Sequence, residues 1–174
     1  MNKRILIVFF VIISSIIFVG CNAKIDDINF YLNPGVDTIT LNSEYEDPGV
    51  TAKVFGLKRS TEVLENTVNT NEIGTYYITY SFEYKEFYFE LTRIVVVIDE
   101  TPPVIELNPG IDTIKVGQTW IDAGVSVDDN SENNTTVAVS GNVDIATKGS
   151  YIITYTVTDS SGNSSSIRRI INVI

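Results

Sequence analysis

The sequence predicts an all-β protein in which two similar β-sandwich domains follow an N-terminal targeting segment. Large apolar residues alternate with threonine near the C-terminus, and this period of two residues is typical of half-buried strands. No window shows the sustained period of 3.6 residues that marks an amphipathic helix. Several segments also occur twice at a constant spacing, which indicates a duplicated domain.

Residues 1–20 have the features of a secretory signal. Lys3 and Arg4 form a positively charged start, and residues 5–19 are apolar except for two serines. This apolar stretch is too short for a comfortable transmembrane span of about 20 residues. We therefore expect a targeting segment that does not join the fold.

The end of this segment resembles the lipobox of bacterial lipoproteins. Gly20 precedes Cys21, the only cysteine, although Phe18 stands where the pattern usually has leucine. The resemblance implies a lipid on Cys21, removal of the preceding residues, and a short tether over residues 21–24. An uncleaved anchor or an ordinary secretory signal stays open as the alternative. Either way the remaining chain lies outside the membrane.

The repeat fixes the domain boundaries. Residues 32–39 (LNPGVDTI) return as residues 107–114 (LNPGIDTI), 75 positions later. A period of about 75 residues is too long for a solenoid unit and suits a small autonomous domain. We therefore expect one domain over residues 25–98 and a second over residues 99–174.

The second copy shows its strands most clearly. Residues 151–157 alternate large apolar side chains with residues that are mostly threonine, as a half-buried strand does. Residues 159–163 (DSSGN) supply turn formers, and residues 164–174 form the returning strand of a hairpin. About seven short strands per domain are expected, at spacings typical of a sandwich.

Two tyrosines refine the type of sandwich. Tyr151 precedes Ile153 by two residues, and Tyr76 precedes Ile78 in the same way. In immunoglobulin-type sandwiches a tyrosine stands two residues before a core cysteine, and its hydroxyl bonds back to the neighbouring corner. The spacing predicts an immunoglobulin-like sandwich with isoleucine in the core position; strand propensity alone is the other interpretation.

The second copy resembles a known family through several motifs in order. These are DETPPVI from residue 99, WIDAGV from residue 120, GSY from residue 149 and YTVTDSSGN from residue 155. They resemble the bacterial Ig-like domain found in pesticidal crystal proteins and many surface proteins. The first copy is a divergent member, since it has Tyr84, Lys85 and Glu86 in place of the DSSGN turn. The resemblance implies extracellular display, spacing or adhesion, without catalysis or a fixed ligand.

Composition excludes several functions. The chain of 174 residues has no histidine, so a serine or cysteine nucleophile has no imidazole base. A formal charge of −10 argues against nucleic acid, because phosphate binding depends on clustered Lys and Arg. We expect no enzyme and no cofactor, apart from the metal considered below.

Calcium is the one metal that the residue types allow, because oxygen ligands are abundant and histidine is absent. No fixed-spacing motif is present, and a solvated acidic loop is the favoured interpretation. The candidate ligands are Asp99, Glu100, Asp128, Asp129 and Asp159.

Aromatic residues crowd into one segment of the first domain. A hairpin cannot place them all in one core, so a sugar- or protein-binding patch is one interpretation and cross-strand packing is the favoured one. The candidate binding residues are Tyr84, Phe87, Tyr88 and Phe89.

Three further residues are expected to be structural. Trp120 matches Tyr45 in the repeat and should pack near a bend. Pro102 and Pro103 should stiffen the segment between the domains, because proline fixes φ and biases its predecessor toward extended conformations; a flexible elbow stays open.

These observations predict a non-catalytic protein held by a lipid on Cys21 at the extracellular face of the bacterial cell membrane. Its Ig-like modules would serve adhesion, spacing or binding of an extracellular protein. The alternative is a carbohydrate- or cell-wall-binding lipoprotein that uses the aromatic hairpin of the first domain.

Overall fold

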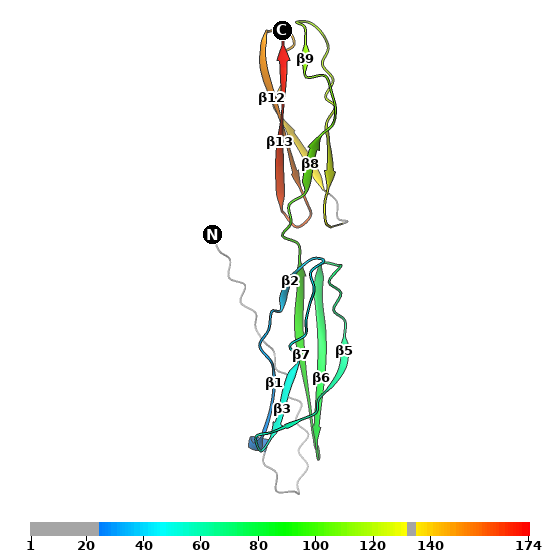
Figure 1. Ribbon diagram of the computed structural model, residues 1–174, viewed down its shortest axis with the longest axis vertical. Helices are drawn as coiled ribbons and strands as arrows, with labels where there is room; N and C mark the ends of the chain where they lie inside the picture. The colour runs from blue at the N-terminus through cyan, green and yellow to red at the C-terminus, as the bar shows by residue number, and fades with distance from the viewer. Residues whose placement is uncertain (1–24, 132–134) are drawn as a thin grey trace. The chain divides into compact units, whose positions relative to one another are not determined.

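The computed structural model describes residues 25–131 and 135–174, and Cys21 with the targeting segment lies outside them. The chain divides into two compact units, one ending at Ile98 and the other running over Asp99–Ile174 (Figure 1). The described residues form strands and one short 3-10 helix, η1 (Ile25–Asp27), so the prediction of an all-β protein is confirmed. None of the described helices has the length and apolar character needed to cross a membrane.

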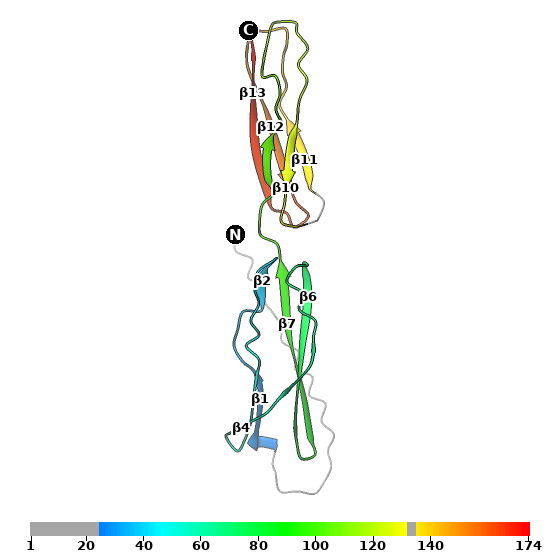
Figure 2. The same cartoon turned by 45° about the vertical axis from the view of Figure 1, so that its right-hand side comes forward.

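The first unit consists of two sheets that face each other across a core. One sheet has the order β2-β7-β6-β5 and the other the order β1-β3-β4. Figure 2 shows β1 and β4 on one side of the unit and β6 and β7 on the other. The strands are β1 (Ile28–Leu32), β2 (Thr38–Thr40), β3 (Val50–Val54), β4 (Leu57–Arg59), β5 (Glu62–Asn66), β6 (Gly74–Tyr84) and β7 (Phe87–Ile98).

The second unit repeats this topology with one strand fewer among its described residues. Its larger sheet has the order β11-β12-β13-β9 and its smaller sheet pairs β10 with β8. The strands are β8 (Val104–Leu107), β9 (Thr113–Ile114), β10 (Val125–Asp128), β11 (Thr136–Ser140), β12 (Gly149–Thr158) and β13 (Ser164–Val173).

The first unit has the expected seven strands, and the second has six among its described residues. In the first unit, Phe55 and Gly56 both have positive φ and turn the chain directly from β3 into β4. Two consecutive residues with positive φ define the tight hairpin turn that suits the twist of the strands. At the equivalent positions the second unit has Asn130 and Ser131, and within residues 125–131 and 135–174 no further strand joins the smaller sheet after β10.

The long hairpin of each unit supplies most of its core. In the second unit Ile153 and Tyr155 from β12 and Ile171 from β13 are buried, and Leu107 and Val125 from the smaller sheet pack against them. The first unit has the equivalent cluster around Ile78, Tyr80 and Val95. Alternation along β12 and β6 thus places the large side chains between the two sheets, as a sandwich requires.

Candidate functional site

Three aspartates gather at one end of the second unit. Asp129 directly follows β10, Asp159 directly follows β12, and Asp99 lies in the segment that leads to β8. Because β10 runs antiparallel to β8, the end of β10 lies beside the start of β8, with Asp128 opposite Val104. The topology therefore brings together residues that are 30 positions apart in the sequence.

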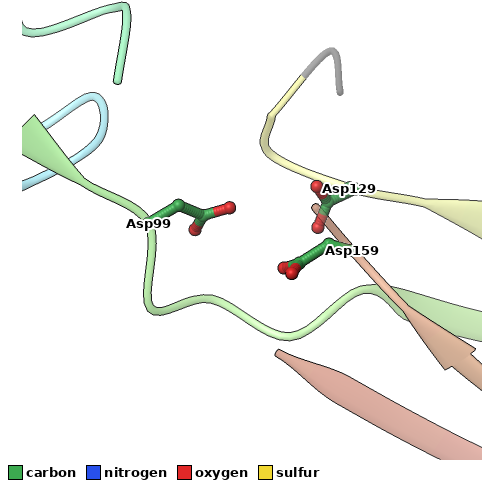
Figure 3. Close-up of side chains that lie close together, drawn as sticks. All are labelled: Asp99, Asp129 and Asp159. Carbon is green, nitrogen blue, oxygen red and sulfur yellow. The ribbon is translucent and has the colours of Figure 1, made fainter. Parts of the chain in front are cut away.

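The carboxylates of this acidic cluster (Asp99, Asp129 and Asp159) face a common space (Figure 3). One oxygen from each residue lies within 4.8 Å of the others. Asp99 and Asp159 are only 7% and 5% exposed, and Asp129 is half-buried. Three like charges are thus held together with little access to water, an arrangement that a cation would stabilise.

Each aspartate is oriented by hydrogen bonds on one side. Asp99 Oδ1 accepts from the backbone N of Thr101 at 2.9 Å and from Nδ2 of Asn130 at 3.2 Å. Asp129 Oδ2 accepts from the backbone N of Ser131 at 3.3 Å and from its hydroxyl. No described residue donates a hydrogen bond to Asp99 Oδ2 or Asp129 Oδ1, although both atoms are buried.

Asp159 is held by the turn that it begins. Its two oxygens accept from the backbone N and from Nδ2 of Asn163, both at 2.8 Å. Burial by itself raises the pKa of Asp159, but the hydrogen bonds from Asn163 and from the backbone of Gly162 and Ser161 outweigh it and lower the pKa. This carboxylate is therefore charged at neutral pH.

The other two candidate metal ligands lie outside the acidic cluster. Glu100 and Asp128 are exposed, and neither belongs to the group of three. Asp128 occupies an exposed position of β10, where the burial alternates from residue to residue. Each is the direct neighbour in sequence of a cluster member, so backbone alternation separates them.

The aromatic hairpin of the first unit is largely packed against itself. Phe82 and Phe89 are paired across β6 and β7, and their rings stack with centroids 6.1 Å apart. Phe87 stacks on Phe89 at 6.3 Å, and Tyr84 packs against the core cluster that contains Phe82. Tyr88 is 46% exposed and donates a hydrogen bond to Glu90. Of the four candidate binding residues, Tyr88 alone is strongly exposed.

Both tyrosines of the predicted corner bond to the backbone upstream. The hydroxyl of Tyr151 donates to the carbonyl of Thr147 at 2.8 Å, and that of Tyr76 donates to Glu72 at the same distance. Ile153 is buried two residues after Tyr151. This is the geometry of the tyrosine corner in immunoglobulin-type sandwiches.

The remaining candidates are Trp120 and the two prolines that precede β8. Trp120 packs against the cluster of Ile153 and donates its Nε1 hydrogen to the carbonyl of Ile111 at 3.0 Å. It also lines a shallow hollow in which no side chain is ionisable. Pro103 is buried and Pro102 is exposed.

Sequence reasoning missed two buried arginines. Arg169 is 2% exposed and donates to the carbonyls of Asn108 at 2.5 Å and Gly124 at 3.2 Å and to Asp112 at 2.8 Å. Arg93 makes the same set of contacts in the first unit. The hydrogen bond that Arg169 donates to Asp112 raises the pKa of the arginine against the opposing effect of burial, which keeps the guanidinium charged. These arginines tie loops to the sheet.

Comparison with known proteins finds a family match within the second unit. Residues 110–173 match the family described as bacterial surface protein, Ig-like domain. No curated protein is significantly similar to the chain. Among solved structures, a lipoprotein from Bacteroides thetaiotaomicron is 17% identical, with a TM-score of 0.36, over 83% of this chain and all of the other. That TM-score is too low to support an argument.

Proposed function

We propose that this chain is a non-catalytic lipoprotein of the bacterial surface, attached through a lipid on Cys21, whose folded units act as a spacer or partner-binding module. The observation that carries the proposal is the match of residues 110–173 to a domain of bacterial surface proteins. The lipobox-like end of the targeting segment supports the mode of attachment. Stable anchoring requires two or more membrane signals, such as two acyl chains.

The chemistry of the chain supports a non-catalytic role. It has no histidine to act as a general base near neutral pH. The acidic cluster of the second unit consists of three aspartates, whose charges have one sign only. The buried arginines are engaged by loop carbonyls and by carboxylates of their own units.

Replacing the cysteine tests the anchor. In a bacterial host, the wild-type chain is expected to incorporate radioactive palmitate, to fractionate with membranes and to be digested by protease added to intact cells. The Cys21→Ser chain should incorporate no lipid and should be released or stay as a precursor. Ser14→Ala, a change in the same segment, serves as the control and should behave as wild type.

Two outcomes contradict this proposal. Undiminished lipid labelling of the Cys21→Ser chain excludes Cys21 as the attachment point. Full protection of the wild-type chain from external protease, under conditions that digest a known surface protein, excludes display on the outside.

A carbohydrate-binding role is the second candidate, and the exposure of Tyr88 favours it. Flat rings supply contact area for sugars and proteins at low entropic cost. A pull-down with peptidoglycan and a glycan array distinguish the two roles. Tyr88→Ala should abolish retention, whereas Tyr77→Ala, the same change at an exposed ring on the neighbouring strand β6, should not. Absence of any retention of the unmodified chain rejects the carbohydrate role.

A further inference from the structure

We propose that the acidic cluster of the second unit is a calcium site, with Asp99, Asp129 and Asp159 as its carboxylate ligands. Two buried carboxylate oxygens, in addition to the negative charge of the cluster, indicate a bound cation. Asp99 Oδ2 and Asp129 Oδ1 are buried, and no described residue donates a hydrogen bond to either. A buried ionised oxygen without a partner is costly, and a coordinated cation removes that cost.

The orientation of these atoms fits a bound ion. Only 7% of Asp99 is exposed to solvent, and Figure 3 shows its carboxylate directed toward Asp129 and Asp159. Its other oxygen is held in place by Thr101 and Asn130, so the side chain is fixed with one oxygen left for the common space. Asp129 is arranged in the same way by Ser131. Hydrogen bonds on one oxygen therefore preorganise the other oxygen as a ligand.

The spacing and the atom types select calcium. Calcium–oxygen distances are about 2.3–2.6 Å, so two ligands on opposite sides of one ion lie about 4.6–5.2 Å apart. The cluster oxygens lie within 4.8 Å of one another, so one calcium ion can reach all three. Magnesium requires about 2.0–2.1 Å and near-octahedral order, whereas calcium accepts the more flexible geometry of three separate segments. Carboxylate oxygens are hard ligands, whereas zinc and copper favour nitrogen and sulfur.

The first unit shows how the same end closes without an ion. By the repeat, Val54 occupies the position of Asp129 and Tyr84 the position of Asp159. Val54 is fully buried in an apolar cluster with Phe82, and Tyr84 and Phe89 pack against that cluster. Apolar contacts thus hold this end of the first unit together. In the second unit carboxylates stand at these positions, and a divalent cation supplies the cohesion that apolar packing supplies in the first.

Binding would join three separate segments of the second unit. Asp99 lies in its first residues, Asp129 lies after β10, and Asp159 lies in the hairpin turn between β12 and β13. Asn163 already links two of them, since its Nδ2 donates to the carbonyl of Asp99 at 3.2 Å as well as to Asp159. A shared ion would therefore order the start of the unit against its hairpin turn.

Calcium titration of the chelator-treated full chain in mild detergent tests the site. Trp120 is the only tryptophan and lies in the second unit, so its fluorescence during heating follows that unit. Extracellular modules bind calcium with a Kd of about 0.1–1 mM. At ten times the Kd, binding multiplies the folded-to-unfolded ratio by about 11, which raises the melting temperature by several degrees. Calorimetric titration should give one calcium ion per chain.

Neutral variants identify the ligands. Asp129→Asn and Asp99→Asn should lose the calcium response, and without calcium they should melt no lower than wild type, because each removes repulsion in the cluster. A residue with a purely structural role would instead lower the melting temperature in both conditions. Asp128→Asn and Glu100→Gln make the same charge change at the adjacent exposed residue and should keep the full response.

Three results overturn the proposal. The first is no shift of melting temperature and no heat of binding up to about 10 mM calcium, ten times the weak end of the usual range. The second is an equal response in wild type and Asp129→Asn. The third, an equal response to magnesium at the same concentrations, rejects calcium as the specific ion.

Discussion

Arg169 lies on the core face of β13, in line with the buried Ile171 and Val173. Its guanidinium reaches the loop carbonyls of Asn108 and Gly124 and the carboxylate of Asp112. The arginine therefore supplies a donor to the carbonyl of Asn108 and a second donor to the carbonyl of Gly124, which also accepts from the backbone N of Asn108. Gly110 allows this arrangement, because a Cβ there would lie 3.1 Å from Nη1 of Arg169 and 2.8 Å from Ala123.

Arg169→Met should destabilise the second unit by about 3 kcal/mol, because methionine fills the space but leaves the Asn108 carbonyl and Asp112 without their donor. Urea unfolding followed by Trp120 fluorescence measures the loss. Arg168→Met, the same change at the adjacent exposed residue, should alter stability by less than about 0.5 kcal/mol. Equal losses in the two variants would show that the buried contacts contribute nothing.

The period of two residues could have identified this arginine. Arg169, Ile171 and Val173 share one parity, as do Arg93, Val95 and Val97, so each arginine falls on the apolar face. Its partners could not be foreseen in the same way. Asn108 and Gly124 belong to loops, and the strand pattern does not specify where loop carbonyls point.

The sequence indicates that the metal ligands would be acidic residues, but it does not indicate which acidic residues come together. Five acidic residues were candidates, and the structure brings three of them together. Alternation along β10 could have excluded Asp128, whereas Glu100 lies between strands, where a sequence pattern gives no side-chain direction. Spacings of 30 residues also match no fixed-length binding loop.

At the scale of elements, the two central hairpins were the most predictable part of the fold. The alternation over residues 151–157 and the turn at 159–163 correspond to β12 and to its connection with β13. Short strands such as β9 carry too few residues for any pattern. About seven strands per domain were expected, and the first unit has seven, whereas the described residues of the second unit form six, with no counterpart of the strand that follows the turn of Phe55 and Gly56.

Gly141, at the end of β11, is required by both backbone conformation and space. Its φ is +104°, and a Cβ there would lie 2.2 Å from the carbonyl oxygen of Ile152. Gly141→Ala should therefore cost about 3 kcal/mol or more, since a positive φ alone costs about 1–2 kcal/mol and the backbone must also move.

Gly117→Ala provides the comparison for this change. Gly117 has a φ of +81°, and no atom lies within 4 Å of a Cβ added there. Its cost should be confined to the strained conformation, about 1–2 kcal/mol. Urea midpoints from Trp120 fluorescence compare the two variants, and a Gly141→Ala chain as stable as Gly117→Ala would contradict the close approach.

At the scale of the whole molecule, each unit contains one buried tyrosine bonded to an aspartate. Tyr80 donates to Asp47 beside Arg93, and Tyr155 donates to Asp122 beside Arg169. Burial, followed by the hydrogen bond to the aspartate, raises the pKa of both tyrosines above 10. The arginines oppose this shift without cancelling it. Both units therefore bury a neutral phenol that the unfolded chain ionises more readily.

Up to about pH 10 the free energy of unfolding should therefore not depend on tyrosine ionisation. At higher pH it should fall, because the tyrosine hydroxyl loses its proton in the unfolded chain but keeps it in the folded one. Melting temperatures between about pH 8 and 11 measure this decline. Tyr155→Phe should cost about 1.5 kcal/mol at neutral pH and reduce the alkaline decline of the second unit. Tyr77→Phe, at an exposed ring, should leave the decline unchanged. The same slope in both variants would contradict the role of Tyr155.

The pairing of β9 with β13 has a mechanical consequence. These strands are parallel, with Thr113 opposite Asn172 and Ile114 opposite Val173, and β13 is the last strand of the unit. When force pulls the C-terminal end of β13 away from the start of the unit, parallel partners slide along each other, so their hydrogen bonds share the load instead of opening one after another. For a domain displayed on a cell surface, resistance to being pulled open matters as much as resistance to heat.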